Sequence, residues 1–181
     1  MGEIKAVPQV KLFVGVLTSI PEALPEVRAR LSALYGPADL ASEEFPFDKT
    51  NYYDEEMGSP LFRSFLGFSG LIGPAEIAEI KVETNIIEAE MATRSSGVQR
   101  PVNLDPGYLE LSKIVLASTK NFYHRIYISM GIYAEVTMHF EAGQWKSFPW
   151  TFPDFQTGRY SAFFISLRNR YRQQLKLEAQ I

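Results

Sequence analysis

Hydrophobic periodicity in the first 120 residues changes in a fixed order, and this order constrains the fold more than any other feature of the sequence. Apolar runs of strand length alternate with segments whose apolar residues recur at the three- and four-residue spacing of a helix. The expected strands are Val10–Thr18, Leu40–Phe47, Leu61–Ile72 and Leu109–Ala117, and the expected helices are Pro21–Tyr35 and Ala75–Thr93. The order strand, helix, strand, strand, helix, strand predicts a split βαβ, or ferredoxin-like, core.

The rest of the chain predicts elements that extend this core. His124–Phe140 has the pattern of two strands, and Met130-Gly131 between them suits a hairpin turn. An aromatic loop with a short strand is expected at Trp145–Phe155, and a terminal helix with an aromatic face at Arg159–Leu177. We therefore expect an α+β fold, with a mainly antiparallel sheet, a ferredoxin-like core, an added β-hairpin and a C-terminal helix. One larger mixed sheet is the alternative.

Glycine and proline modify two of the expected strands and predict one turn. Pro46 restricts the strand before it to a sheet edge or a strand end, and Gly67 and Gly70 favour a bulge or a close backbone approach in the strand that contains them. The run Asn103–Gly107 (NLDPG) has the composition of a turn, because proline fixes φ and glycine accepts the left-handed region.

Length and composition limit the functional classes. A chain of 181 residues predicts a single domain over residues 1–181, with residues 1–9 as a flexible tail. The absence of cysteine excludes disulfides, thiolate catalysis and cysteine metal sites. No run reaches the ~20 apolar residues of a membrane span, and a net charge of −3 argues against bulk capture of nucleic acid or of an anionic membrane. The sequence therefore predicts a cytoplasmic protein that binds neither a membrane nor nucleic acid, and it leaves a homo-oligomer open.

Polar and charged residues are interleaved with apolar strands between residues 100 and 137, and this density is the main indication of a site. The residues concerned are Arg100, Asn103, Asp105, Lys113, Lys120, His124, Arg125 and Glu135. A carboxylate among apolar neighbours needs a partner, and the hairpin register gives Glu135 a basic one, His124 or Arg125. A structural salt bridge explains Glu135 as well as a site does.

The candidate roles follow from the chemistry of each group. Lys120 and Arg125 suit a phosphate or carboxylate ligand, and His124 could act as a general base. Asp105, beside Asn103, is either part of a turn or a ligand for substrate or metal. Asp105 and Glu135 are the candidate ligands of a Mg²⁺ ion, and with His124 they are the candidate catalytic residues.

A polar line on the second helix completes the set of candidates. Lys81, Asn85 and Glu88 are spaced by four and three residues, so they follow one edge of the apolar stripe of that helix. Such a line is either a solvated helix edge or the wall of a cleft where the helix meets the sheet. With Arg100, Asn103, Lys120 and Arg125, these three residues are the predicted ligand-binding residues.

Several segments resemble one family, the uncharacterised prokaryotic domain of unknown function 4416 family. They are AEIKVETNIIE, FPFDKTNYYDEEMG, NLDPGYLELSKIVLASTK, HRIYISMGIYAEVTM and WTFPDF. Some members of that family carry a GTP-binding label, but the chain lacks the G-x-x-x-x-G-K-[ST] phosphate loop. Binding of GTP through such a loop is therefore set aside, and nucleotide binding by another route is left open.

These observations lead to two functional hypotheses. In the first, a polar cleft binds a small anionic ligand, a nucleotide or a phosphorylated metabolite, with metal-assisted phosphoryl or hydrolytic chemistry if the protein is an enzyme. In the second, the aromatic loop Trp145–Phe155 and the tyrosine loop around Tyr52 hold a protein partner or a second copy of the chain without catalysis. The exposure of Trp150 and Phe152 discriminates between the two: buried indole rings favour the first hypothesis, and an exposed aromatic patch favours the second.

Overall fold

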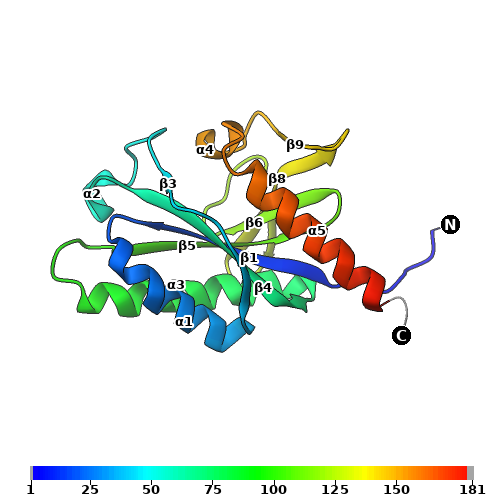
Figure 1. Cartoon of the computed structure of the whole chain (residues 1–181), viewed down its shortest axis with the longest axis horizontal. Coiled ribbons are helices and arrows are strands. Elements are labelled where there is room, and N and C mark those ends of the chain that lie inside the picture. Colours follow the sequence, from blue (N-terminus) through cyan, green and yellow to red (C-terminus); the bar gives the residue numbers. More distant parts are fainter. Residues whose placement is uncertain (1, 179–181) are drawn as a thin grey trace.

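The computed structural model describes residues 2–178, and an antiparallel sheet forms its centre (Figure 1). The strands within the described residues are β1 (Val10–Thr18), β2 (Ala38–Ala41), β3 (Phe45–Pro46), β4 (Phe62–Ile72), β5 (Val102–Leu109), β6 (Lys113–Ser118), β7 (Ile126–Ser129), β8 (Ile132–Glu141) and β9 (Gln144–Ser147). Their order in the sheet is β2-β4-β1-β5-β6-β8-β7, with β3 added to β4 and β9 added to β8. The fold is therefore α+β with a mainly antiparallel sheet, as the sequence predicts.

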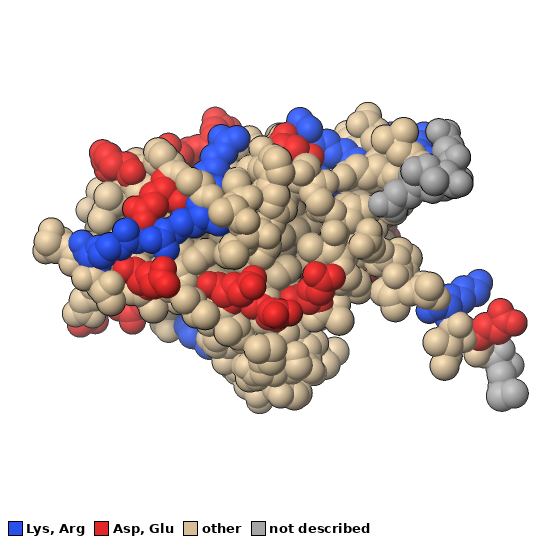
Figure 2. Space-filling model, turned by 90° about the horizontal axis from the view of Figure 1, so that it is seen from below, with Lys and Arg blue, Asp and Glu red and all other residues tan. Residues whose placement is uncertain are grey.

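Helices cover the two faces of this sheet (Figure 1). The α-helices are α1 (Leu24–Tyr35), α2 (Asp54–Met57), α3 (Ile77–Arg94), α4 (Pro153–Gln156) and α5 (Ser161–Glu178), and short 3-10 turns precede α1 and α3 at Pro21–Ala23 and Pro74–Glu76. In Figure 1, α1 and α3 lie below the sheet and α5 crosses above it. Figure 2 shows the α1 and α3 side, where acidic and basic side chains lie close together. Arg30 of α1 pairs with Glu90 of α3 at 2.7 Å.

The central position of β1 follows from its sequence. All nine residues of β1 are buried, and successive side chains point to opposite faces. Leu12 and Val14 join the apolar cluster under α1 and α3, whereas Phe13 packs into the aromatic cluster of α5. A continuous apolar run predicts a strand covered on both faces, and that prediction is confirmed.

Aromatic rings fill the layer between the sheet and α5. Phe65 of β4 has the rings of Tyr160, Phe163 and Phe164 at centroid distances of 4.8, 5.3 and 5.2 Å. Gly67 lets α5 come close, because a Cβ atom at this position would lie 2.5 Å from the Cδ1 atom of Leu167. The predicted close approach in β4 is confirmed, and so is the terminal helix.

The first half of the chain forms the strand run β2-β4-β1-β5, with α1 and α3 as its crossover helices. The sheet does not stop at β5 but continues into β6, β8 and β7. A ferredoxin-like core and a single domain over the whole chain therefore stay predictions. Residues 2–9, expected to be a tail, have no regular secondary structure and are exposed.

Two local predictions are wrong. Asn103–Gly107 is not a turn but the interior of β5, because each of its residues pairs with β1, from Asn103 opposite Leu17 to Gly107 opposite Phe13. Long-range pairing has outweighed local turn chemistry, and Pro106 is tolerated because β6 pairs with β5 only from Gly107 onward. The strand expected at Leu109–Ala117 is divided between β5 and β6.

The strand expected at Leu40–Phe47 is also divided, into β2 and β3, with Pro46 at a strand end as predicted. The predicted hairpin turn is confirmed, since Met130 and Gly131 have positive φ angles of 53° and 78°. Within the part of the chain that the structure describes, no helix has the length and apolarity required to span a membrane.

Candidate functional site

β5 and β6 separate along part of their length, and the candidate site lies in the gap that this leaves in the sheet. The two strands pair only over three residues next to their connection, from Gly107 opposite Leu116 to Leu109 opposite Ile114. Beyond that point β5 pairs with β1 alone and β6 pairs with β8 alone. The free edge of β5 from Val102 to Pro106 therefore faces a gap in the sheet.

Two charged side chains of α3 bind the backbone on this free edge. Glu88 accepts a hydrogen bond from the Leu104 N–H group at 2.7 Å, and the Lys81 ammonium donates to the Leu104 carbonyl oxygen at 2.6 Å. Both side chains are buried. An unpaired buried peptide group costs free energy, so these two bonds replace those that a neighbouring strand would have made.

A cavity of about 510 Å³ occupies the gap. Its lining comes from β4, α3, β5, β6, β8, α4 and four of the connections between elements. The residues are Phe47, Thr50, Tyr52, Tyr53, Arg63, Lys81, Asn85, Arg100, Asn103, Asp105, Leu116, Ala117, Ser118, Thr119, Lys120, Arg125, Glu135, Phe152, Pro153, Asp154 and Phe155. This volume lies within the ~300–1,000 Å³ range of small-molecule sites.

A continuous series of polar contacts forms one wall of the cavity. Arg100 donates to Glu88 at 2.6 Å and also to the side-chain oxygen of Asn103. Asn103 in turn donates to the Oδ2 atom of Asp105 at 2.7 Å, and Arg63 donates to the same oxygen at 2.7 Å. The side chains from Glu88 to Arg63 therefore hold one another in fixed orientations.

This wall continues from Arg63 towards α5. The Nε atom of Arg63 lies 3.8 Å from Asp154, and the Tyr160 hydroxyl donates to Asp154 at 3.0 Å. At 3.8 Å the contact with Asp154 is an ion pair without a hydrogen bond, and the buried Nε atom has no hydrogen-bond partner within residues 2–178. A buried donor without an acceptor is uncommon, and here the nearby Asp154 carboxylate supplies opposite charge instead.

Two carboxylates of this wall, Glu88 and Asp105, have pKa values that are shifted in opposite directions. For Glu88, burial is the dominant effect and raises the pKa, although Lys81 and Arg100 oppose it. For Asp105, burial would raise the pKa, but Arg63 and the other cations outweigh it and lower the pKa. Burial, with a contribution from Asp105, raises the pKa of the nearby Tyr53 hydroxyl to about 12. Asp105 is therefore a firmly ionised acceptor at neutral pH.

A second group of polar side chains lies on the β6 and β8 side. Arg125 donates to Glu135 at 2.7 Å and to the Ser118 hydroxyl at 3.0 Å. The Nε2 atom of His124 lies 3.0 Å from the same Glu135 oxygen, and the His124 ring stacks on Trp150. The expected salt bridge of Glu135 is present, with both predicted basic partners in contact with it.

The loop before α2 reaches over the mouth of the cavity. The Lys120 ammonium lies 2.9 Å from the Tyr52 hydroxyl and 4.6 Å from the centre of the Tyr52 ring. Both side chains are exposed. A contact between exposed groups contributes little free energy, so the Tyr52–Lys120 contact is a weak closure of the mouth.

Positive charge exceeds negative charge in the lining. The cations are Arg63, Lys81, Arg100, Lys120 and Arg125, and the carboxylates are Asp105, Glu135 and Asp154. Lys120 is the lining cation without a carboxylate partner in the described part of the chain, because Arg63, Arg100, Lys81 and Arg125 each lie within 4 Å of a carboxylate. The cavity therefore has chemistry suited to a negatively charged ligand.

The predicted Mg²⁺ ligands do not form a metal site. Asp105 lies against Arg63, and Glu135 lies against Arg125. Residues 2–178 contain no group of three or more His, Asp or Glu side chains that could hold a metal ion. Each of the two predicted Mg²⁺ ligands is therefore paired with a guanidinium group in this structure.

Most of the predicted site residues line this one cavity. They are Lys81, Asn85, Arg100, Asn103, Asp105, Lys120, Arg125 and Glu135. Glu88 lies behind the wall, where it binds Arg100 and Leu104. His124 lies behind Glu135 and is outside the lining, so the structure gives it a place to orient Glu135 rather than to meet a ligand.

Three lining residues that make polar contacts in the site were not predicted from the sequence. Arg63 and Asp154 belong to the polar wall, and Ser118 holds Arg125. Arg63 carries the same signal as the residues that were found, since it is a charged residue within the apolar strand LFRSFL. Asp154 gave no such signal, because its role depends on contacts with β4 and α5.

The aromatic loop is partly buried and partly exposed. Trp145 and Phe155 belong to the aromatic core, and Trp150 is half-buried, with its indole N–H donating to the Val136 carbonyl oxygen. Phe152 is 40% exposed. Of the two residues whose exposure discriminates between the hypotheses, Trp150 is partly buried and Phe152 is exposed, so this observation is divided between the ligand site and the interaction module.

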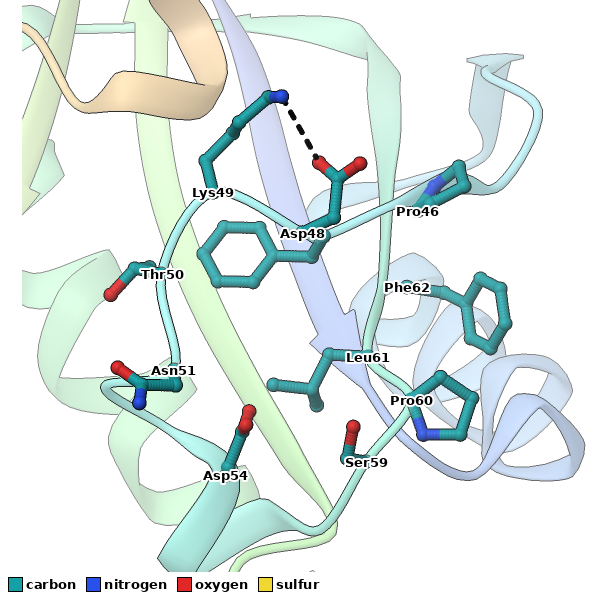
Figure 3. A pocket seen from close by; sticks show the side chains of 11 residues that line it. Pro46, Asp48, Lys49, Thr50, Asn51, Asp54, Ser59, Pro60, Leu61 and Phe62 are labelled. Carbon is teal, nitrogen blue, oxygen red and sulfur yellow. Dashed lines mark ion pairs between the residues drawn. The ribbon is translucent and has the colours of Figure 1, made fainter.

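A second cavity, of about 420 Å³, lies on the other side of the loop before α2. Figure 3 shows its lining, with Lys49 directed to Asp48 and the prolines Pro46 and Pro60 at its edge. The Lys49–Asp48 distance is 3.9 Å, and both side chains are about half exposed. The residues that line this second cavity include no buried cation, whereas Arg63 and Lys81 of the first cavity are buried. We therefore take the opening between β5 and β6 as the candidate site.

Comparisons with known proteins identify a family and go no further. No curated protein and no solved structure matches the chain. The family model described as a domain of unknown function (DUF4416) matches residues 8–171, which is most of the chain. The protein therefore belongs to this family of unknown function, as the resemblance of its segments predicts.

Proposed function

We propose that the cavity between β5 and β6 binds a small anionic ligand, a nucleotide or a phosphorylated metabolite. The observation that carries the proposal is the charge of the lining, five cations against three carboxylates, with Lys120 at the mouth without a carboxylate partner in residues 2–178. Cationic side chains in a site of low dielectric constant bind phosphate and carboxylate groups through charge-assisted hydrogen bonds.

The cavity offers distinct places to the two parts of such a ligand. Lys120, Arg125 and the Ser118 hydroxyl lie together at the end of β6 and suit the anionic group. The rings of Phe47, Tyr53 and Phe152 also line the cavity and suit a planar or apolar part of the ligand. A nucleotide or a phosphorylated metabolite has both parts, whereas an inorganic ion has only one.

The proposal is limited to binding. Asp105 and Glu135 are held by guanidinium groups, and His124 lies outside the lining, so the candidate catalytic residues are occupied in structural contacts. Positioning of the ligand by this preformed polar wall is the function that the geometry supports best.

The test is thermal stabilisation of the purified protein by a panel of nucleotides and phosphorylated metabolites. A ligand present at ~100 times its dissociation constant adds about 2.7 kcal/mol to the free energy of unfolding. We expect at least one compound to raise the melting temperature of the wild type, and Lys120→Ala to lose most of that shift while keeping the melting temperature of the free protein.

Lys49→Ala is the matched control, because it removes an exposed lysine that lines the second cavity. It should bind as the wild type does. An equal loss in both variants would show general charge attraction and would contradict the proposed site. The absence of a shift from any compound in the panel would contradict the proposed function.

A further inference from the structure

An exposed apolar surface surrounds β7, away from the lining of the cavity. Its residues are Phe122, Tyr123, Ile126, Tyr127, Ile128 and Met130, with exposed fractions of 58%, 77%, 74%, 58%, 38% and 59%. Single exposed apolar residues are ordinary on protein surfaces. Successive strand side chains point to opposite faces, so Ile126 and Ile128 lie on one face of β7 and Tyr127 on the other, and exposed apolar side chains on both faces of one strand indicate an interaction site. We call these six residues the β7 surface.

The strand at the centre of this surface has a free edge. β7 ends the sheet order and pairs with β8 alone. Its sequence, IYIS, has no lysine or proline of the kind that protects edge strands against pairing with another chain. The outer backbone groups of β7 are therefore available to a further strand.

The absence of charge indicates what kind of strand fits this edge. Residues 126–134 (IYISMGIYA) include no charged side chain, although nine residues of a chain that is 22% charged would carry about two. At a two-fold axis a side chain near the axis meets its own copy, so any charge there would be repelled by itself. A neutral edge satisfies this requirement, whereas recognition of a charged partner would use charges of opposite sign.

We propose that β7 pairs with β7 of a second copy of this chain, antiparallel and about a two-fold axis, and that the two sheets become continuous. Antiparallel pairing of one edge with itself is self-complementary and closed, so it yields a dimer and not a filament. The β7 surface of each copy lies on and beside this strand and is covered by that of the other copy.

The size of the surface agrees with a dimer interface. With full side-chain areas of roughly 150–250 Å², the exposed fractions of the six residues correspond to on the order of 600 Å² per copy. The backbone of β7 and the neighbouring Val136, which is 36% exposed, add to this area. Stable interfaces bury about 800 Å² per partner, so the dimer lies near the standard size.

The proposed dimer interface and the candidate site share one connection of the chain. Phe122 and Tyr123 belong to the same connection between β6 and β7 as Lys120 and Arg125 of the cavity. Residues that the second copy contacts thus lie in the same loop as residues that line the cavity. The dimer does not depend on the proposed ligand, however, and each can be tested without the other.

The experiment measures the molar mass of the purified protein by light scattering across a concentration series. The wild type should have twice the chain mass of 20.5 kDa and should dissociate on dilution. Ile126→Lys places a charge on β7 in each copy and should shift the protein to 20.5 kDa, or weaken the dimer at least tenfold, with an unchanged melting temperature at the lowest concentration.

Ile86→Lys is the matched control, because Ile86 is a 53% exposed isoleucine of α3, far along the chain from β7. This variant should remain a dimer. Slowed amide exchange of residues 126–129 in the wild-type dimer, and its loss in Ile126→Lys, would place the contact at β7. A wild type of 20.5 kDa at all concentrations would overturn the proposal, even if β7 captured another protein, and so would a dimer unaffected by Ile126→Lys.

Discussion

β5 consists of two halves with different surroundings. From Gly107 to Leu109 it pairs with β1 on one side and β6 on the other, whereas from Val102 to Pro106 it pairs with β1 alone. The paired half is tightly packed, and a Cβ atom on Gly107 would lie 2.5 Å from the Val115 carbonyl oxygen. The open half borders a cavity of about 510 Å³.

The comparison shows what replaces a strand where a sheet opens. In the paired half, backbone bonds and apolar contacts hold the two strands together. In the open half, Glu88 and Lys81 bind the Leu104 peptide groups, and the charges of Arg100, Asp105 and Arg63 follow in series. Two of the buried charges of this protein, Lys81 and Glu88, thus lie where peptide groups lack a neighbouring strand, beside the cavity.

The largest effect is expected from Glu88→Ala, in the open half. This change leaves Lys81 and Arg100 without a buried counter-charge and the Leu104 N–H group without an acceptor. Breaking a buried ion pair costs about 3–5 kcal/mol, and we expect a loss of that size in the free energy of unfolding, measured by urea denaturation.

Glu90→Ala serves as the control on the same helix. Glu90 is 58% exposed and pairs with Arg30 at the surface, so its removal should cost less than about 1 kcal/mol. A similar small loss for Glu88→Ala would show that the open edge of β5 does not depend on these charges, and the contrast between the two halves would fail.

Gly107→Ala tests the paired half and should have the next largest effect. The added methyl group has no space, because backbone and side-chain atoms of β1 and β6 surround the position. Overpacking of a core costs about 1–3 kcal/mol, and the melting temperature should fall accordingly. Gly97→Ala, at a position with no atom within 4 Å of the added Cβ, should change stability by less than about 1 kcal/mol.

Acid titration separates two carboxylates of the open half by the sign of their effect. The pKa of Asp105 is lowered on folding, mainly by Arg63 against the effect of burial, so its carboxylate contributes stability above the unfolded pKa of about 3.9, and this is lost as pH falls through the lower folded pKa. Burial raises the pKa of Glu88, so its contribution is complete below the unfolded pKa of about 4.3 and is lost as pH rises through the folded pKa.

The unfolding free energies of Asp105→Asn and Glu88→Gln, followed from pH 7 to pH 3, should therefore differ from the wild type with opposite trends. The unfolding free energy of the wild type should exceed that of Asp105→Asn by less below about pH 4, since the pKa of Asp105 in the unfolded chain is about 3.9. The advantage of the wild type over Glu88→Gln should grow as the pH falls from neutral towards that region. If the two differences changed in the same direction with pH, the pKa shift of either Asp105 or Glu88 would be assigned wrongly.

The two halves of β5 also show how far the sequence predicts this molecule. The long apolar periods predict β1, α3 and α5, and charged residues among apolar strands or along one edge of a helix predict most of the charged residues that line the cavity. The opening itself was not predictable, because local periodicity does not show where β6 leaves β5. The turn signal of Asp105-Pro106-Gly107 is likewise local, and pairing with β1 overrides it.

The smallest effect concerns the mouth of the open half, where Tyr52 lies over Lys120. Tyr52→Phe removes the hydroxyl that binds the lysine at 2.9 Å but keeps the ring beneath its charge. Because both groups are exposed, the free energy of unfolding should change by less than about 0.5 kcal/mol. Local opening is more sensitive than global stability, so amide exchange of residues 48–54 should become faster while β1 and β4 exchange at wild-type rates. Unchanged exchange in this loop would show that the cation–ring contact alone closes the mouth, and Tyr52→Ala would then be the variant that opens it.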